Sequence, residues 1–194
     1  VQNQELRMLI KYMRFIFIIV IGSLLFSFAN RGTPGGGPKD EIPPQIVKST
    51  PENFSTNFNG KEIKIYFDEY VKIKNLQRQL IISPPMDPAP EVTPLGTASK
   101  YITLKINDTL QENTTYAFNF GNSITDNNEE NPYSYYKFVF STGGYIDSLS
   151  INGQIKDAML RKPEDFVSVR LYEIDSTFND SIVYNKLPQY VTNT

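Results

Sequence analysis

Apolar and polar side chains alternate with a period of two between residues 44 and 142, which is the spacing of β-strands and not of helices. The alternation predicts strands at 61–67, 100–106, 115–120 and 136–141, with further candidates at 45–48 and 79–83. In the first of these strands, Ile63, Ile65 and Phe67 lie on one face, because successive side chains of a strand point to opposite sides. We therefore predict an all-β fold for this part of the chain.

Turn-forming residues separate the predicted strands. Asn59-Gly60 is a dipeptide typical of a tight hairpin turn. Ser83-Pro84-Pro85 ends a strand, because proline has no N–H to donate to a neighbouring strand. Residues 122–132 are polar and are predicted to form a loop. Short strands at this spacing, with no helical segment between them, favour a sandwich of two sheets over residues 44–143.

A second group of alternating segments follows Thr142-Gly143-Gly144. The pattern predicts strands at 151–155, 167–173 and 181–184. In the middle one, Val167, Val169 and Leu171 are expected to point inward. Three strands bury too little apolar surface to be stable alone. We therefore predict a partial second β-sandwich over residues 148–194.

The first 29 residues have a different pattern. Arg7, Lys11 and Arg14 precede an apolar run from Phe15 to Phe26, and this is the layout of a secretory signal. The run is shorter than the roughly 20 apolar residues that a membrane-spanning helix needs. The alternative is a buried core helix. We predict that residues 1–29 are a signal peptide or membrane anchor.

The end of this run resembles a lipoprotein signal, on Leu24-Leu25-Phe26-Ser27 followed by Ala29-Asn30-Arg31-Gly32. That resemblance implies a lipid-bearing cysteine at position 28, where this chain has Phe28. Only a thiol forms the thioether to the lipid, so the chain as written cannot be lipidated. Small residues instead favour ordinary cleavage after Ala29. Either the protein is released into the periplasm, or the uncleaved segment tethers it to the membrane. Residues 30–43, rich in Gly and Pro, are predicted to be a flexible linker.

Composition narrows the classes of function. The 194 residues include no cysteine and no histidine, which excludes disulfides, zinc–thiolate sites, cysteine nucleophiles and the Ser-His-Asp triad. The net charge of −2 gives no reason to expect a nucleic-acid partner, since phosphate binding needs a concentrated positive surface. We predict a protein that is not an enzyme and has no cofactor.

Oxygen-bearing side chains gather between Asp126 and Asn131. Asp126, Asn128 and Glu130 are candidate calcium ligands, because calcium takes six to eight oxygen ligands. The spacing is not that of an EF-hand, and a polar loop tip is the alternative. The adjacent Asp68-Glu69 pair is interpreted as a solvated strand end, with one carboxylate holding a neighbouring loop amide.

Two further groups of side chains are candidates for binding or modification. Tyr133 and Tyr135 precede the last strand of the sandwich and are the best candidates for an exposed aromatic patch that binds a ligand. Thr109, Ser148 and Ser181 each follow an aspartate and precede an aliphatic residue. This pattern resembles the O-glycosylation signal of exported Bacteroidetes proteins and implies that these hydroxyls carry glycans.

Several short motifs follow one another along the predicted sandwich: Pro43-Pro44, Ser49-Thr50-Pro51, Asp68-Glu69-Tyr70-Val71, Leu110-x-x-Asn113-Thr114-Thr115-Tyr116, Ile124-x-Asp126 and Phe138-Val139-Phe140-Ser141-Thr142. In this order they resemble the bacterial surface-layer type of Ig-like domain, which implies an Ig-like β-sandwich. With the spacer from Gly32 to Asp40, the chain resembles an envelope lipoprotein of the Bacteroidetes type. The region from Ile151, with its Val-x-Val-x-Leu-Tyr strand, is similar to prealbumin-like domains of the carboxypeptidase-regulatory or collagen-adhesin B type.

These resemblances imply spacers, stalks and adhesive modules. We therefore predict an exported cell-envelope protein of a Gram-negative bacterium, in the periplasm or associated with the membrane. Its expected role is structural or interactive, with an Ig-like module on a flexible stalk. The alternative is a glycan- or peptidoglycan-binding module that uses loop aromatics, and an enzyme ranks third. Expected partners are envelope proteins or glycans, and the membrane where the N-terminal segment stays uncleaved.

Overall fold

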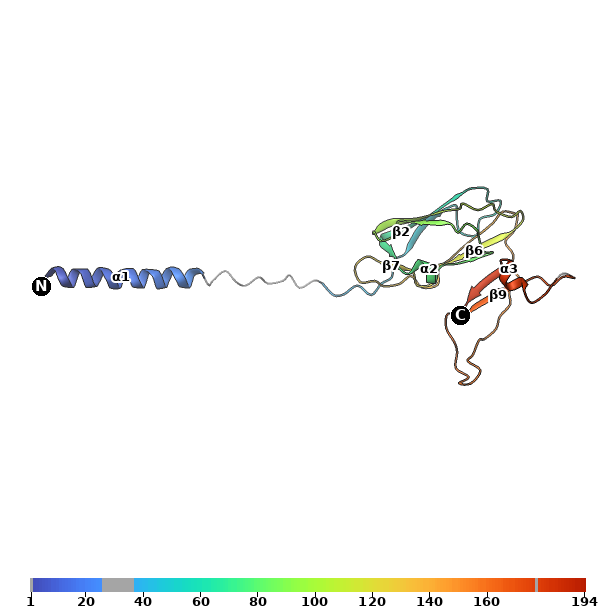
Figure 1. Ribbon diagram of the computed structural model, residues 1–194. Coiled ribbons are helices and arrows are strands. Elements are labelled where there is room, and N and C mark those ends of the chain that lie inside the picture. The colour runs from blue at the N-terminus through green and yellow to red at the C-terminus, as the bar shows by residue number, and fades with distance from the viewer. Residues whose placement is uncertain (1, 26–36, 177) are drawn as a thin grey trace. The chain divides into compact units, whose positions relative to one another are not determined.

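The computed structural model describes residues 2–25, 37–176 and 178–194 of the chain (Figure 1). It divides into two compact units, Val1–Lys39 and Asp40–Thr194, which are described separately. Phe28, Ala29 and residues 30–36 of the linker lie outside the described residues, so the lipoprotein-like site and the cleavage site stay predictions.

The N-terminal unit contains one helix, α1 (Gln2–Leu25). Glu5 lies in its first turn, and the side chains described along it are exposed. Among the described residues, no helix combines the length and the apolar character that crossing a bilayer requires. The assignment of residues 1–29 as a signal or an anchor therefore stays a prediction.

Two antiparallel sheets form the body of the second unit. The larger sheet has the order β1 (Ile46–Thr50), β2 (Glu62–Ile73), β5 (Ser99–Lys105) and β4 (Glu91–Thr93), with β7 (Ile124–Asp126) paired to the far end of β2. The smaller sheet has the order β3 (Ile81–Ser83), β6 (Thr115–Asn119) and β8 (Lys137–Ser141). A short helix, α2 (Leu76–Gln79), leads into β3. The strands expected from 45 to 141 are all present, and the predicted all-β sandwich is confirmed in this region.

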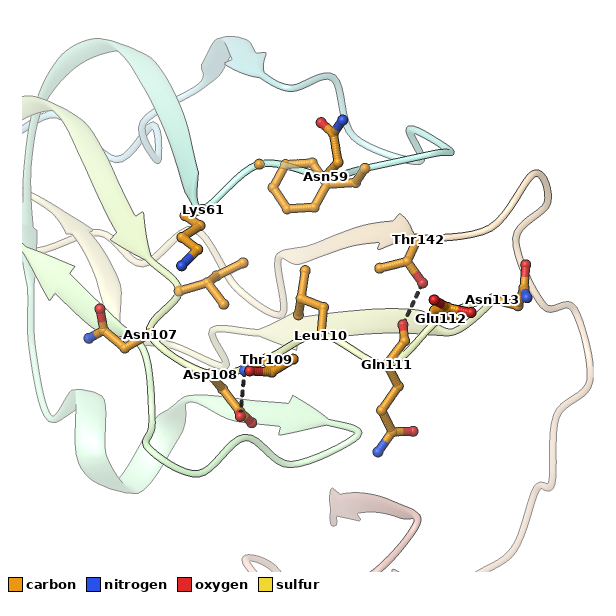
Figure 2. A pocket seen from close by; sticks show the side chains of 13 residues that line it. Asn59, Lys61, Asn107, Asp108, Thr109, Leu110, Gln111, Glu112, Asn113 and Thr142 are labelled. Atoms are coloured by element: carbon orange, nitrogen blue, oxygen red, sulfur yellow. Dashed lines mark hydrogen bonds between the residues drawn. The ribbon is translucent and has the colours of Figure 1, made fainter.

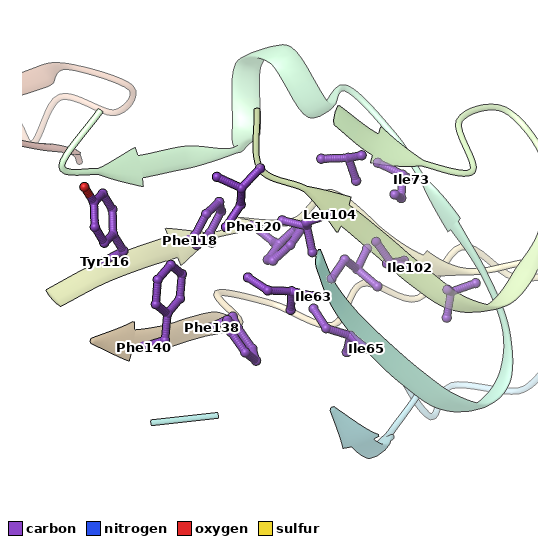
Figure 3. Packing of buried hydrophobic residues seen from close by; sticks show 14 of the residues in the cluster. Ile63, Ile65, Ile73, Ile102, Leu104, Tyr116, Phe118, Phe120, Phe138 and Phe140 are labelled. Carbon is purple, nitrogen blue, oxygen red and sulfur yellow. The ribbon is translucent and has the colours of Figure 1, made fainter. Parts of the chain in front are cut away.

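The core lies between the two sheets (Figure 3). Ile63 and Ile65 of β2 and Leu104 of β5 point inward from one side, and Phe118 and Phe140 from the other; all five are fully buried. Each such side chain contributes about 1.5–3 kcal/mol relative to an exposed one. The period-two alternation in the sequence therefore corresponds to a real inner face.

The segment from 122 to 132 is more than a polar loop, so that expectation was wrong for its first part. Residues Ile124–Asp126 form β7, and Val71 and Ile73 of β2 pair with it. Strand β2 runs six residues beyond its predicted end, and its far end would leave backbone groups unpaired without a partner strand. Strand β7 supplies that partner, which a polar composition alone did not indicate.

Asn59-Gly60 does not make a hairpin turn. The connection between β1 and β2 runs from 51 to 61, and its middle part lies along β8. Phe54 N donates to Val139 O at 2.7 Å, and Phe58 N donates to Ser141 O at 2.9 Å. The connection therefore crosses from one sheet to the other, which local turn chemistry did not predict.

The region after residue 144 differs from the expected second sandwich. It contains β9 (Ser168–Leu171) and β10 (Tyr190–Asn193), paired antiparallel, and a short helix, α3 (Ile182–Asn185). Residues 151–155 do not form a strand, and residues 181–184 overlap α3, so both strand predictions were wrong. Val169 and Leu171 are exposed, because no second layer covers the β9–β10 sheet within the described residues.

Strand β10 lies beside β3, the edge of the smaller sheet. Val191 N donates to the Ser83 hydroxyl oxygen at 3.1 Å. The Arg78 guanidinium lies 4.5 Å from the centre of the Phe166 ring. Among the described residues, the buried core cluster contains none after Phe140, and contacts of this kind attach the C-terminal region to the sandwich.

Candidate functional site

An open groove lies at the end of the sandwich where β2 begins (Figure 2). Its volume is about 540 Å³, and the loops 58–61 and 106–113 form its walls together with Thr142. Strand β2 starts at residue 62 and β5 ends at residue 105, so the two sheet strands hold both loops at the same end. The groove is therefore a product of topology, since its walls are about 50 residues apart in the sequence.

Polar groups dominate the groove, and several of them stabilise its walls. The Asp108 carboxylate accepts hydrogen bonds from Thr109 N at 2.6 Å and from Asp87 N at 2.9 Å. The Thr142 hydroxyl donates to Gln111 O at 2.7 Å (Figure 2). With Asn, Gln, Lys and Thr side chains around a small apolar floor, the groove can offer hydrogen bonds to a polar ligand. It offers no histidine or cysteine for nucleophilic chemistry.

The loop after β7 is organised by one buried carboxylate. Asp126 is 2% exposed, and its Oδ1 accepts hydrogen bonds from the N–H groups of Asn128, Glu129 and Glu130 at 2.7–2.9 Å. Its Oδ2 accepts one from Asn131 N at 3.0 Å. Burial by itself raises the pKa of Asp126, but the four N–H groups outweigh burial and hold that pKa below its ordinary value. The carboxylate therefore stays charged and fixes the loop.

The three candidate calcium ligands point to different partners. Asp126 faces its own loop amides, whereas the Glu130 carboxylate contacts the Lys74 ammonium, which lowers the pKa of Glu130. The Asn128 side-chain oxygen accepts a hydrogen bond from the Asn127 amide at 2.9 Å. In the described part of the chain, no three acidic side chains gather closely enough to hold a metal ion. Calcium binding by these residues stays a prediction, because their side chains do not converge on one point in this structure.

The two candidate tyrosines are separated by the fold. Tyr133 is half-buried and packs against the core, with its ring edge-on to Tyr136 at 5.6 Å between ring centres. Burial raises the pKa of Tyr136 to about 12, and Tyr133 adds to that shift. Tyr135 is 70% exposed and has a positive φ of 57°. The structure therefore presents Tyr135 to solvent and uses Tyr133 as packing, so the two do not form one aromatic patch.

The three candidate glycosylation sites are exposed. Thr109 lies in the wall of the groove, Ser148 follows the end of the sandwich, and Ser181 precedes α3. A hydroxyl must be exposed to be modified, and these three residues satisfy that requirement. Glycosylation itself stays a prediction.

The Asp68-Glu69 pair serves the fold. The Asp68 carboxylate accepts a hydrogen bond from Gln45 N at 2.8 Å, which confirms the expectation that one of the two carboxylates holds a neighbouring loop amide. The expected strand end was wrong, because both residues lie within β2, which continues to Ile73. Burial raises the pKa of Glu69, and the carboxylates of Asp126 and Asp68 raise it further. The sequence had no signal for this proximity, because Asp126 is nearly 60 residues away along the chain.

Comparisons with known proteins agree with this architecture. A family profile described as a bacterial Ig-like domain matches residues 40–142. No curated protein matches the chain. A solved structure of PcoC, a methionine-rich copper resistance protein from Escherichia coli, is similar over 52% of this chain and 98% of that chain. The two sequences are 15% identical, and the TM-score is 0.35.

Proposed function

The chain belongs to the bacterial Ig-like domain family, and from this premise we propose that it is a non-catalytic structural or interaction module of the cell envelope. Domains of this family are generally non-catalytic and are typically extracellular or surface-exposed. In the proposed role, residues 1–29 direct export or anchor the chain, and the sandwich holds the region after residue 144 at a set distance. Envelope proteins or glycans are the proposed partners.

The observation that carries this proposal is that the chain enters and leaves the sandwich at opposite ends. Asp40 O accepts a hydrogen bond from the Asn131 side chain at 2.9 Å, beside the loop that follows β7. Thr142 lies in the wall of the groove, at the end where β2 begins. The part of β2 from Glu62 to Val71, which pairs with Asp126, connects these two ends and spans about 30 Å at the usual rise of a strand. Such a module separates whatever is attached to its two termini.

The segment 53–58, which follows β1, is bonded in parallel to β8, the last strand before the chain leaves the sandwich. Ser55 and Phe140 form a parallel bridge, and the segment 53–58 exchanges backbone hydrogen bonds with β8 along its length. The Asn53 side chain adds two more, by accepting from Val139 N at 2.7 Å and donating to Lys137 O at 3.0 Å. When residues 40 and 143 are pulled apart, the N-terminal side reaches these bonds through β1, which is paired with β2, and the C-terminal side reaches them through β8. Because the pairing is parallel, its bonds are then loaded together along the strand direction. Bonds loaded together must break together, so this pairing resists extension.

Single-molecule force spectroscopy of the full chain, pulled between residues 40 and 143, tests the proposal. The expected result is one cooperative unfolding event for the sandwich. In an Asn53→Ala variant this event should occur at a lower force, because two of the bonds between the segment and β8 are lost.

Asn122→Ala is the matched control, since Asn122 is exposed and lies away from the parallel pairing. Its unfolding force should equal that of the unchanged chain. Extension of the sandwich without a force peak, or an equal loss of force in both variants, would contradict the load-bearing role.

A second candidate function is binding of glycan or peptidoglycan by the loop aromatics, and the exposure of Tyr135 favours it. Retention of the chain on insoluble peptidoglycan should then decrease in Tyr135→Ala. Because Tyr133 packs on the core, Tyr133→Phe keeps that packing and should leave the retention unchanged. Equal retention of all three proteins would eliminate this candidate.

A further inference from the structure

The outer face of the larger sheet carries two tyrosines side by side. Tyr66 of β2 and Tyr101 of β5 are cross-strand partners, and their ring centres are 5.9 Å apart. Tyr101 is 45% exposed, and Tyr66 is half-buried. Both side chains point away from the core, because the inward positions on these strands hold Ile63, Ile65 and Ile102. The rings are therefore not needed to fill the interior.

Lysine ammonium groups flank the two rings. Lys48 of β1 lies over the Tyr66 ring with its nitrogen 4.8 Å from the ring centre, and Lys64 of β2 lies 6.0 Å from that of Tyr101. These four side chains, Tyr66, Tyr101, Lys48 and Lys64, are called the Tyr-Lys face below. A third pair of this kind joins β5 and β2, with the Lys100 nitrogen 5.5 Å from the centre of the Tyr70 ring.

The charge on this face is only partly neutralised. Glu62 forms an ion pair with Lys64 at 3.2 Å, and this contact raises the pKa of Lys64. Among the described residues, Lys48 takes part in no ion pair, so its partner is the Tyr66 ring. An ammonium group that contacts an aromatic ring on one side still has N–H groups directed to solvent, and these can bind an anion.

We propose that the Tyr-Lys face binds an acidic polysaccharide. The pyranose rings of such a polymer present flat C–H faces that can stack on Tyr66 and Tyr101. Their carboxylates complement the ammonium groups of Lys48 and Lys64 on either side. The face lies on a sheet and is open along the strands, which suits a linear chain of sugars. A single-stranded nucleic acid is also a polyanion that can stack on tyrosines, so the test below includes an oligonucleotide as the competing ligand.

This binding surface is independent of the proposed spacer role. The parallel pairing of 53–58 with β8 joins the connection after β1 to the smaller sheet, whereas the Tyr-Lys face lies on the outer side of β1, β2 and β5. Failure of polysaccharide binding would leave the force measurement unaffected, and the reverse also holds.

Affinity electrophoresis of the full chain in gels that contain polygalacturonate tests the inference. The same polymer with its carboxylates methyl-esterified is the matched neutral ligand, and a thymidine oligonucleotide probes nucleic-acid binding. We expect retardation by polygalacturonate, much weaker retardation by the ester, and loss of binding as NaCl rises from about 50 mM to about 500 mM.

Two sets of variants separate stacking from charge. The Tyr66→Ala/Tyr101→Ala variant should weaken binding about tenfold or more, and Tyr66→Phe/Tyr101→Phe should retain it because the rings remain. The Lys48→Gln/Lys64→Gln variant keeps both rings and should weaken binding about fivefold with a smaller salt dependence. Tyr145→Ala and Lys137→Gln, at exposed positions elsewhere, are the matched controls and should bind like the unchanged chain.

Several results would overturn the inference. No retardation by polygalacturonate would do so, as would binding that the alanine and glutamine variants leave unchanged. Binding lost in Tyr135→Ala but kept in Tyr66→Ala/Tyr101→Ala would assign the ligand to the loop instead. Tighter binding of the oligonucleotide, lost in the same variants as polysaccharide binding, would identify the face as a nucleic-acid surface. Thermal unfolding of each variant shows whether an altered fold explains the loss.

Discussion

Strands β2 and β9 have the same alternating pattern and opposite outcomes. In β2, Ile63 and Ile65 are fully buried, because the smaller sheet packs over them. In β9, Val169 and Leu171 are exposed, because within the described residues β10 is its one partner strand and no second layer covers the pair. The alternation of apolar and polar side chains therefore predicts which face of a strand can be buried. Burial itself depends on a second layer, which the strands between 44 and 142 have and which β9 lacks among the residues that the structure describes.

The largest expected effect comes from replacing one apolar side chain in each of the two regions. Phe140→Ala should lower the free energy of unfolding of the sandwich by about 3–5 kcal/mol, because it removes a fully buried ring that contacts Phe58 and Tyr116. Leu171→Ala should lower it by no more than about 0.5 kcal/mol. Urea unfolding of both variants measures the difference. Similar losses would mean that β9 is buried in solution.

The next test removes the buried carboxylate that organises the loop after β7. Asp126→Ala should cost about 2–4 kcal/mol of unfolding free energy, because four backbone N–H groups lose their acceptor.

The pH dependence sharpens this test. Since the pKa of Asp126 is depressed in the folded protein, its contribution is present above the ordinary aspartate pKa of about 4 and is lost as pH falls through the depressed value. Asp126→Asn should lack that part of the acid dependence. If the free energy of unfolding of Asp126→Asn depends on pH as it does in the unchanged chain, then Asp126 does not organise this loop.

A smaller effect is expected from the tyrosine at the start of β6. The Tyr116 hydroxyl oxygen accepts a hydrogen bond from Gln111 N at 2.9 Å, five residues earlier, as in the tyrosine corner of Greek-key sandwiches. Burial raises the pKa of Tyr116. Tyr116→Phe keeps the ring and should cost about 1 kcal/mol, measured by urea unfolding. Tyr190→Phe, in β10, is the control and should cost nothing measurable.

The smallest effect concerns the attachment between the two regions. Arg78→Ala removes the contact with the Phe166 ring and should cost about 0.5–1 kcal/mol locally. Hydrogen exchange of residues 166–194 should become faster, while exchange in β2 and β5 stays the same. Faster exchange throughout the sandwich would show that the two regions share more stability than their contacts indicate.

Much of the sandwich could be predicted because its determinants are local. Strands at 61–67, 100–106, 115–120 and 136–141 follow from alternation and turn residues, and each matches an observed strand within a few residues at its start. The strand β7 was missed because its burial depends on the far end of β2, not on its own composition. The strands expected at 151–155 and 181–184 were wrong for the same reason, since alternation without a covering layer does not require a strand.

For the candidate sites too, the sequence showed local features, and the fold decided the contacts between distant residues. The sequence identified Asp126, Tyr133 and Tyr135 as residues of interest but not their roles, because those roles depend on which neighbours the fold provides. The groove, the proximity of Glu69 to Asp126 and the Tyr-Lys face were not predicted at all. Outward positions of a strand carry no periodic signal of partnership, so cross-strand pairs such as Tyr66 and Tyr101 emerge only from the register.

The sequence by itself determined the all-β character of residues 44–142, the inner face of each main strand and the absence of cysteine and histidine chemistry. These properties depend on side-chain identity and on the two-residue repeat of a strand. Only the tertiary structure decided which alternating segments are buried, which end of the sandwich carries the groove, and that the chain enters and leaves at opposite ends. Those properties depend on contacts between residues that are distant in the sequence, and no local pattern encodes such contacts.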